Sequence, residues 1–255
     1  MSRVIVVVIG LFILLSCAPT RKEELRFEYN YIPNRTYNYS LNIDGEGIFS
    51  YFLISFSGKV KLTSDVILTV SETERGKLYT MRIEKIDLKS SLGFEQEVNR
   101  LLSQTNFIVS FYMTSKGRKD VLSDSYLSIL LDVLIPRLPE LDTTNEMSYR
   151  EFDLSFGDTT VRNEVSNVSV ITPVSGRTFS LDSFSSILSL ELKNRDIVVG
   201  DIKMRSQSRV DDFTLTENIT EIDSKTTIPI YTGSATRVVG FKGKIRLIFR
   251  LKESS

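Results

Sequence analysis

Along most of the chain, apolar and polar residues alternate with the two-residue period of a half-buried β-strand. The alternation starts at Leu25, resumes after Pro33, and returns in long stretches after residue 145. It is clearest from Arg237 to Lys252, where apolar and basic residues take opposite faces. Long antiparallel strands with one apolar face predict a mainly β protein, in which one large curved sheet wraps around a core.

Two local patterns predict breaks in this sheet. The sequence Asp44-Gly45-Glu46-Gly47 is typical of a turn. Between Ile83 and Ile86 the apolar positions change phase, which predicts a β-bulge or a bend.

Two segments in the middle of the chain have helical spacing instead. The first runs from Phe94 to Gln104, and the second begins at Ser123 or Asp124 and ends before Pro136. The second segment is apolar around most of its circumference, which predicts burial. Its side chains either belong to the core or line a groove that holds a lipid or acyl chain. Four leucines carry this groove hypothesis: Leu127, Leu130, Leu131 and Leu134.

The start of the chain has the pattern of a secretory signal peptide. Arg3 precedes an apolar run from Val4 to Leu15, which is shorter than the roughly 20 residues that cross a bilayer. The run ends in Leu14-Leu15-Ser16-Cys17, which resembles the lipobox of bacterial prolipoproteins. This resemblance implies cleavage before Cys17, a diacylglycerol on its sulfur and an acyl chain on its new amine. The alternative is an ordinary signal peptide with an incidental cysteine.

The resemblance also defines an organisation and a location. Residues 1–16 are the expected signal peptide, residues 17–24 a short lipidated tether, and residues 25–255 a single β-rich domain. Ala18 is not the Asp that favours inner-membrane retention in enteric bacteria. In a host with two membranes, we therefore expect the protein on the outer membrane, facing the periplasm.

Composition excludes several function classes. The formal net charge is +0, so no overall field attracts nucleic acid. The chain has no histidine, which removes Ser-His-Asp and Cys-His catalysis and the commonest metal ligand. No local motif supplies an activated nucleophile or a phosphate loop, so we expect neither enzymatic activity nor a cofactor. Asn42, Asp44 and Glu46 offer oxygen atoms, but turn chemistry explains them without a metal ion.

A basic stripe lies on one side of the last strand. It consists of Lys242, Lys244, Arg246, Arg250 and Lys252. Such a stripe binds anionic lipid headgroups, or it is a solvent-exposed face whose charges pair with neighbouring carboxylates. The second interpretation is favoured, because the outward faces of antiparallel sheets are usually charged.

The lipobox, the long antiparallel strands and the central helices together resemble half-barrel bacterial lipoproteins of the lipoprotein-localisation (LolA-like) type. Residues 27–89 also resemble the opening sheet of large lipid-transfer proteins. Both resemblances imply a half-barrel sheet, with two helices packed on it, that binds a hydrophobic ligand. We therefore expect a membrane-anchored envelope lipoprotein that binds or carries a lipid. The alternative is a structural lipoprotein that docks a partner protein at the membrane through an exposed apolar patch.

Overall fold

The computed structural model describes residues 26–51, 54–91, 95–96, 99–100, 107–122, 127–140, 145–156, 159–175, 177–192, 199–232 and 235–254. Within these residues the protein is mainly β, as the sequence predicts. A single 11-stranded sheet has the order β5-β4-β3-β2-β1-β11-β10-β9-β8-β7-β6, and every neighbouring pair is antiparallel. The strands are β1 (Arg35–Tyr51), β2 (Ile54–Thr73), β3 (Gly76–Ser90), β4 (Phe107–Met113), β5 (Lys119–Val121), β6 (Asn145–Phe156), β7 (Thr159–Ser175), β8 (Thr178–Leu192), β9 (Val199–Asp211), β10 (Thr214–Thr232) and β11 (Ala235–Ser254).

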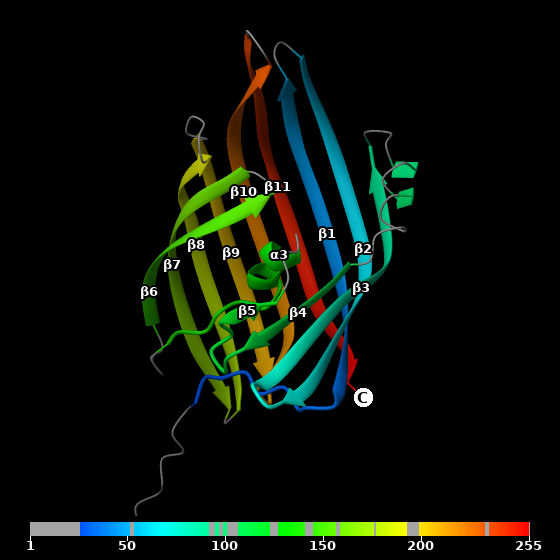
Figure 1. The fold of residues 1–255 in the computed structure, drawn as a ribbon, viewed down its shortest axis with the longest axis vertical. Helices are drawn as coiled ribbons and strands as arrows, with labels where there is room; N and C mark the ends of the chain where they lie inside the picture. Colours follow the sequence, from blue (N-terminus) through cyan, green and yellow to red (C-terminus); the bar gives the residue numbers. More distant parts are fainter. Residues whose placement is uncertain are drawn as a thin grey trace, which may run out of the picture.

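The sheet consists of two meanders that meet at the first and last strands. Strands β1 to β5 follow one another toward one edge, and β6 to β11 follow one another from the other edge. The β1–β11 pair joins them along fifteen residue pairs, from Tyr37–Ser254 to Tyr51–Val239. Figure 1 shows that the sheet curves, and that β4, β5 and the β6–β7 hairpin pass in front of its central strands.

The concave side, which we call the inner face, carries the core. Its buried side chains alternate along the strands with more exposed ones, as Tyr37, Tyr39 and Leu41 of β1 alternate with partly exposed polar residues. The helix α3 (Leu127–Leu134) lies against this face. The opposite side, which we call the outer face, carries mostly charged residues.

The sequence prediction of a bulge after Ile83 is confirmed. The register between β2 and β3 shifts between Thr63 and Asp65, and Lys85 has a φ of 50°. One extra residue on β3 restores the inward direction of Leu88, which is buried.

Two other sequence predictions were wrong. Residues 44–47 do not form a turn, because β1 runs straight through them and pairs on both sides. Residues 26–34 do not form a strand: they cross the base of the inner face, and Phe27, Tyr29 and Tyr31 are buried there. Long-range pairing outweighed the local turn preference of glycine and aspartate in the first case.

Of the two predicted helices, the described residues contain one short helix, α3. It ends at Leu134, one residue earlier than predicted, and its predicted start at Ser123 or Asp124 lies outside the described residues. The first predicted helix, Phe94 to Gln104, falls mostly outside them as well. Its residues 95–96 and 99–100 are helical.

The helical residues Glu95 and Asn99 cover an edge of β3 that has no strand partner among the described residues. The pairing of β3 with β4 stops at Ile83. Beyond it, the Asn99 side chain accepts a hydrogen bond from the Leu88 N–H at 3.0 Å and donates one to the Leu88 carbonyl at 2.9 Å. The Ser90 N–H donates to Glu95 at 3.1 Å. Side chains thus replace the missing strand and block further pairing at this edge.

Candidate functional site

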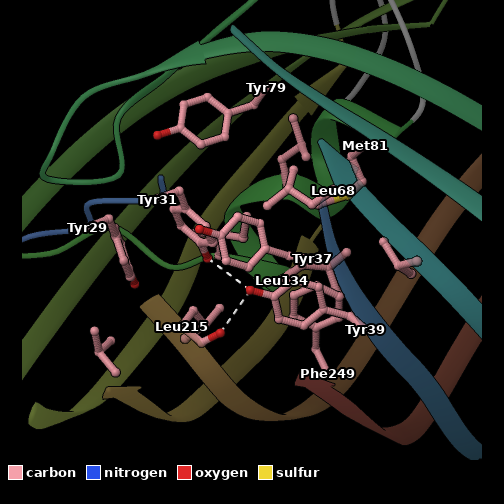
Figure 2. Close-up of a cluster of buried hydrophobic side chains, with 14 of the residues drawn as sticks. Tyr29, Tyr31, Tyr37, Tyr39, Leu68, Tyr79, Met81, Leu134, Leu215 and Phe249 are labelled. Atoms are coloured by element: carbon pink, nitrogen blue, oxygen red, sulfur yellow. Dashed lines mark hydrogen bonds between the residues drawn. The ribbon is translucent and has the colours of Figure 1, made fainter. Parts of the chain in front are cut away.

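Tyrosine side chains seal the base of the inner face. Tyr29, Tyr31, Tyr37, Tyr39 and Tyr79 are all buried there, together with Phe249 (Figure 2). The Tyr39 hydroxyl donates to the Leu215 carbonyl at 2.9 Å, and the Tyr31 and Tyr39 hydroxyls lie 3.2 Å apart.

Each remaining tyrosine is fixed by rings or by a hydrogen bond. The Tyr29 hydroxyl donates to the Pro136 carbonyl at 3.0 Å, and the Tyr37 hydroxyl accepts from the Ile32 N–H at 2.8 Å. The Tyr79 ring stacks on Phe111 with ring centroids 5.5 Å apart. The base is therefore closed to a ligand.

Burial also changes the acidity of this cluster. It raises the pKa of Tyr79 to about 12, with a smaller contribution from Tyr37. Burial likewise raises the pKa values of Tyr29, Tyr31 and Tyr39 above their ordinary range. These phenols stay neutral at physiological pH, so the cluster supplies neither a base nor an anion.

Two polar side chains hold α3 against the inner face. The buried ammonium of Lys119 on β5 donates to Asp132 at 2.8 Å, to the Ile135 carbonyl at 2.6 Å and to the Gly117 carbonyl at 3.0 Å. Asn218 on β10 donates to the Val133 carbonyl at 2.6 Å. Both side chains donate hydrogen bonds to carbonyl groups at or just beyond the C-terminus of the helix, where the backbone supplies no intrahelical donors.

The four leucines of the groove hypothesis take different positions. Leu131 and Leu134 are buried in the core cluster, and Leu130 packs against it while partly exposed. The side chain of Leu127 lies outside the described residues. Leu131 and Leu134 thus occupy the core, so they offer no surface to a ligand.

On the inner face of β7 to β10, small polar residues follow the buried apolar ones, such as Phe179, Leu181 and Val210, farther from the base. Ser183 and Ser206 join their hydroxyls at 2.6 Å. Ser185 donates to Asn167 at 2.7 Å, and Ser208 donates to Asn218 at 2.9 Å. These residues satisfy one another, which removes the penalty of burying them.

Beyond α3, away from the base, the inner face remains apolar but loses its cover. On β2 the exposed fraction rises along the strand from 6% at Ser64 to 47% at Phe56. The same change occurs on β11 between Leu247, which is buried, and Ile245, which is partly exposed. We call this region the open inner face. Its partly exposed members are Ile43, Gly45, Val60, Leu62, Ile202, Met204, Ile222 and Ile245.

The register of the strands makes the open inner face continuous. Gly45 pairs with Val60 on one side and with Ile245 on the other. Ile245 pairs with Ile222, which pairs with Met204. Five adjacent strands thus present one row of side chains. Ser64 lies where this region meets the core, and its hydroxyl is the one buried side-chain oxygen without a hydrogen-bond partner among the described residues.

The outer face carries a different feature, a groove of about 850 Å³ across the same strands. Two rows of long, mostly charged side chains form its walls, and the strand backbone forms its floor. The walls include Lys59, Glu46, Lys244, Asp223 and Lys203 in one row, and Lys61, Asp44, Arg246, Glu221 and Arg205 in the other.

Ion pairs account for much of the predicted basic stripe on β11. Arg250 pairs with Glu217, Lys252 with Asp65 at 2.5 Å, and Arg246 with Glu221 at 3.8 Å. These contacts fit the solvent-exposed interpretation.

Asp44 and Glu46, which the sequence offered as oxygen donors, also lie on the outer face. No cluster of acidic or sulfur ligands able to hold a metal occurs among the described residues. No helix in the part of the chain that the structure describes is long and apolar enough to cross a membrane. Cys17 and the whole predicted signal peptide lie outside that part.

Comparison with known proteins supports the architecture. No family model matches the chain, and no curated protein is significantly similar to it. Among the solved structures that match is one concerned with lipid–protein interactions in lipovitellin. The match covers 89% of this chain and 26% of the lipovitellin chain, with a TM-score of 0.54 and 11% sequence identity. The chain therefore spans about a quarter of the length of lipovitellin, and the likeness is one of fold.

Sequence reasoning missed the open inner face. Its residues come from five strands, and no local motif links them. The available signal was the weakening of apolar character toward Gly45 and Gly243 in otherwise apolar strand faces. That signal can be interpreted only once the strand order is known, because the strand order shows which positions of different strands lie side by side.

Proposed function

We propose that the protein is a lipid-anchored bacterial envelope protein that binds a lipid on the open inner face. The observation that carries the binding proposal is the row of partly exposed apolar side chains that continues the core beyond α3. The fold likeness to lipovitellin supports the same class of ligand.

The chemistry of the open inner face favours an acyl chain. Ile245, Ile222 and Val60 offer aliphatic surface without a charged neighbour on the same face. Each methylene that leaves water against such a surface contributes about 0.8 kcal/mol.

The anchor rests on the lipobox resemblance at Leu14-Leu15-Ser16-Cys17. Lipidation of Cys17 would hold the sheet next to a membrane, where lipid ligands are present. On the same resemblance, Ala18 favours the periplasmic face of an outer membrane.

Ile245→Arg tests the binding site. The full chain, expressed in a bacterium with its signal peptide, is purified in a mild detergent and analysed by native mass spectrometry and lipid extraction. We expect a bound lipid in the unchanged protein and its loss in Ile245→Arg, because the guanidinium occupies the apolar row and remains hydrated.

Ile248→Arg is the matched control. Ile248 lies on the same strand and is also partly exposed, but it faces outward. We expect this variant to keep the bound lipid. An apo mass for the unchanged protein, or equal lipid loss in both variants, would contradict the proposed site.

A further inference from the structure

Exposed apolar side chains are concentrated on the outer face of three strands, β6 to β8. Ten large hydrophobic side chains in the described part of the chain are exposed, and five of them lie here. We call these five the outer patch: Met147, Val168, Val170, Val174 and Phe184. The rest of the outer face is mostly charged, so the concentration needs an explanation.

The strand register makes the outer patch contiguous. Met147 pairs with Val168, and Val168 pairs with Phe184. Val170 follows Val168 on the same face of β7, and Val174 lies at the end of this strand, where the pairing with β8 shifts register between Pro173 and Ser175. From Val168 to Val174 the patch extends about 20 Å along the strand.

The described chain begins at the ends of the strands that carry this patch, on the inner side of the sheet. Phe27 packs edge-on against Phe179 of β8, with ring centroids 5.5 Å apart. Phe179 pairs with Pro173, which precedes Val174. Figure 1 shows the first described residues at the lower ends of β7 and β8.

The entering chain is firmly attached at this corner. The Tyr29 N–H donates to the Ser115 carbonyl at 2.7 Å, and the Asn30 N–H donates to the Phe213 carbonyl at 2.9 Å. Lys116 donates to the Phe27 carbonyl at 2.8 Å. The point at which the tether meets the sheet is therefore fixed.

We infer that the outer patch lies on the lipid bilayer to which Cys17 is anchored. This inference rests on the anchor in the proposed function and adds an orientation to it. Eight residues, 18–25, separate Cys17 from Arg26. A flexible segment of that length reaches about 16 Å, which is comparable with the length of the patch. The tether begins at the strand ends where Val174 also lies, so it holds this end of the sheet, with the outer patch, closer to the membrane than the opposite end, which carries Ile48.

The orientation is measured on the full lipidated chain in vesicles of phosphatidylcholine and phosphatidylglycerol. Phe184→Cys introduces a labelling site, since the sulfur of lipidated Cys17 does not react. The label is a fluorophore, and the vesicles contain lipids with a spin label that quenches it at short range. We expect at least threefold stronger quenching at Phe184→Cys than at the control.

Ile48→Cys is the matched control. Its side chain is 47% exposed and that of Phe184 is 48% exposed, and both lie on the outer face. Ile48 belongs to β1, whereas Phe184 belongs to β8. Val170→Cys provides a second site in the patch, for which we expect the same result as for Phe184→Cys.

The outcomes separate this inference from the proposed anchor. If the unchanged chain does not float with vesicles, or if Cys17→Ala floats equally well, the anchor fails and the orientation falls with it. If the chain floats but Phe184→Cys and Ile48→Cys are quenched equally, the orientation alone is wrong. Shielding of the Phe184 label without lipid quenching would assign the patch to a second copy or a protein partner, and would also overturn the inference.

Discussion

On β1 and β11 the inner face presents Tyr39, Leu41 and Phe249, whereas on β8 and β9 it presents Ser185, Ser206 and Ser208. Both sets are buried. The first, which we call the aromatic half, buries a large apolar area. Its rings contact one another: Tyr39 stacks on Phe249 with ring centroids 4.2 Å apart. The second, which we call the serine half, consists of small polar residues that lie next to the buried Leu181 and Val210 of the same strands and form hydrogen bonds with neighbouring side chains.

The difference shows that one curved sheet reaches the same degree of burial in two ways. The aromatic half is stabilised by the hydrophobic effect, so that each large buried side chain contributes strongly to the free energy of unfolding. In the serine half each hydrogen bond replaces one with water, so the net contribution is about 1 kcal/mol or less per bond. Asn218 connects the serine half to α3 through the Val133 carbonyl.

Alkaline pH should have the largest effect on the stability of the protein, because it ionises the tyrosines of the aromatic half. Burial raises the pKa values of Tyr29, Tyr31, Tyr39 and Tyr79 in the folded protein, to about 12 for Tyr79. Below pH 10 these tyrosines are neutral in both states, and their stabilisation is complete. Above pH 10 the tyrosines ionise in the unfolded chain but not yet in the folded one. Each of them then lowers the free energy of unfolding by about 1.4 kcal/mol per pH unit, until the pH reaches its pKa in the folded protein.

Urea denaturation between pH 9 and pH 12 measures this loss. Tyr79→Phe is the sharper form of the test, because it keeps the ring stacked on Phe111 and removes one ionising group. We expect a shallower decline for this variant. An identical pH dependence in both proteins would show that the cluster does not set it.

Phe249→Ala should have the next largest effect. Its side chain is fully buried, and its removal leaves a cavity beside Tyr39. We expect a loss of about 3–5 kcal/mol in the free energy of unfolding. Ile248→Ala on the outer face is the control and should cost about 1 kcal/mol or less. Urea titrations of both variants measure these losses. Equal losses for Phe249→Ala and Ile248→Ala would mean that the inner face is not the main core.

Asn218→Ala should have an intermediate effect, because it breaks the connection between the serine half and α3. The buried Val133 carbonyl loses its donor, and Ser208 loses its acceptor. We expect a loss of about 1–3 kcal/mol and faster hydrogen exchange in α3. Asn218→Asp should cost more, since it places a carboxylate against a carbonyl oxygen. If exchange in α3 does not change, the asparagine does not hold the helix.

The Ser183–Ser206 pair should show the smallest effect. Ser183→Ala or Ser206→Ala alone leaves one hydroxyl without its partner and should cost about 1 kcal/mol. The double variant should cost little more than either single variant, since it leaves no unpaired hydroxyl. A double-mutant cycle in urea gives the coupling energy. Strict additivity would show that the two serines do not interact.

Much of the fold could be predicted from the sequence. The β-strand character of the chain after residue 145, the bulge near Lys85 and the buried helix before Pro136 were readable, because each depends on the spacing of apolar residues along one segment, although β8 and β10 each continue through stretches without clear alternation. The absence of histidine restricted the chemistry of any site before the fold was known.

Three features were decided by tertiary structure. Pairing with β2 and β11 extends β1 through Gly45 and Gly47, although these glycines favour a turn. The residues 26–34 have the alternation of a strand, yet they cross the base of the sheet because their tyrosines fill it. The open inner face and the outer patch exist because residues far apart in the chain pair in register. Periodicity reports which residues share a face of one strand, but only the order and register of the strands decide which faces combine and which part of them is left uncovered.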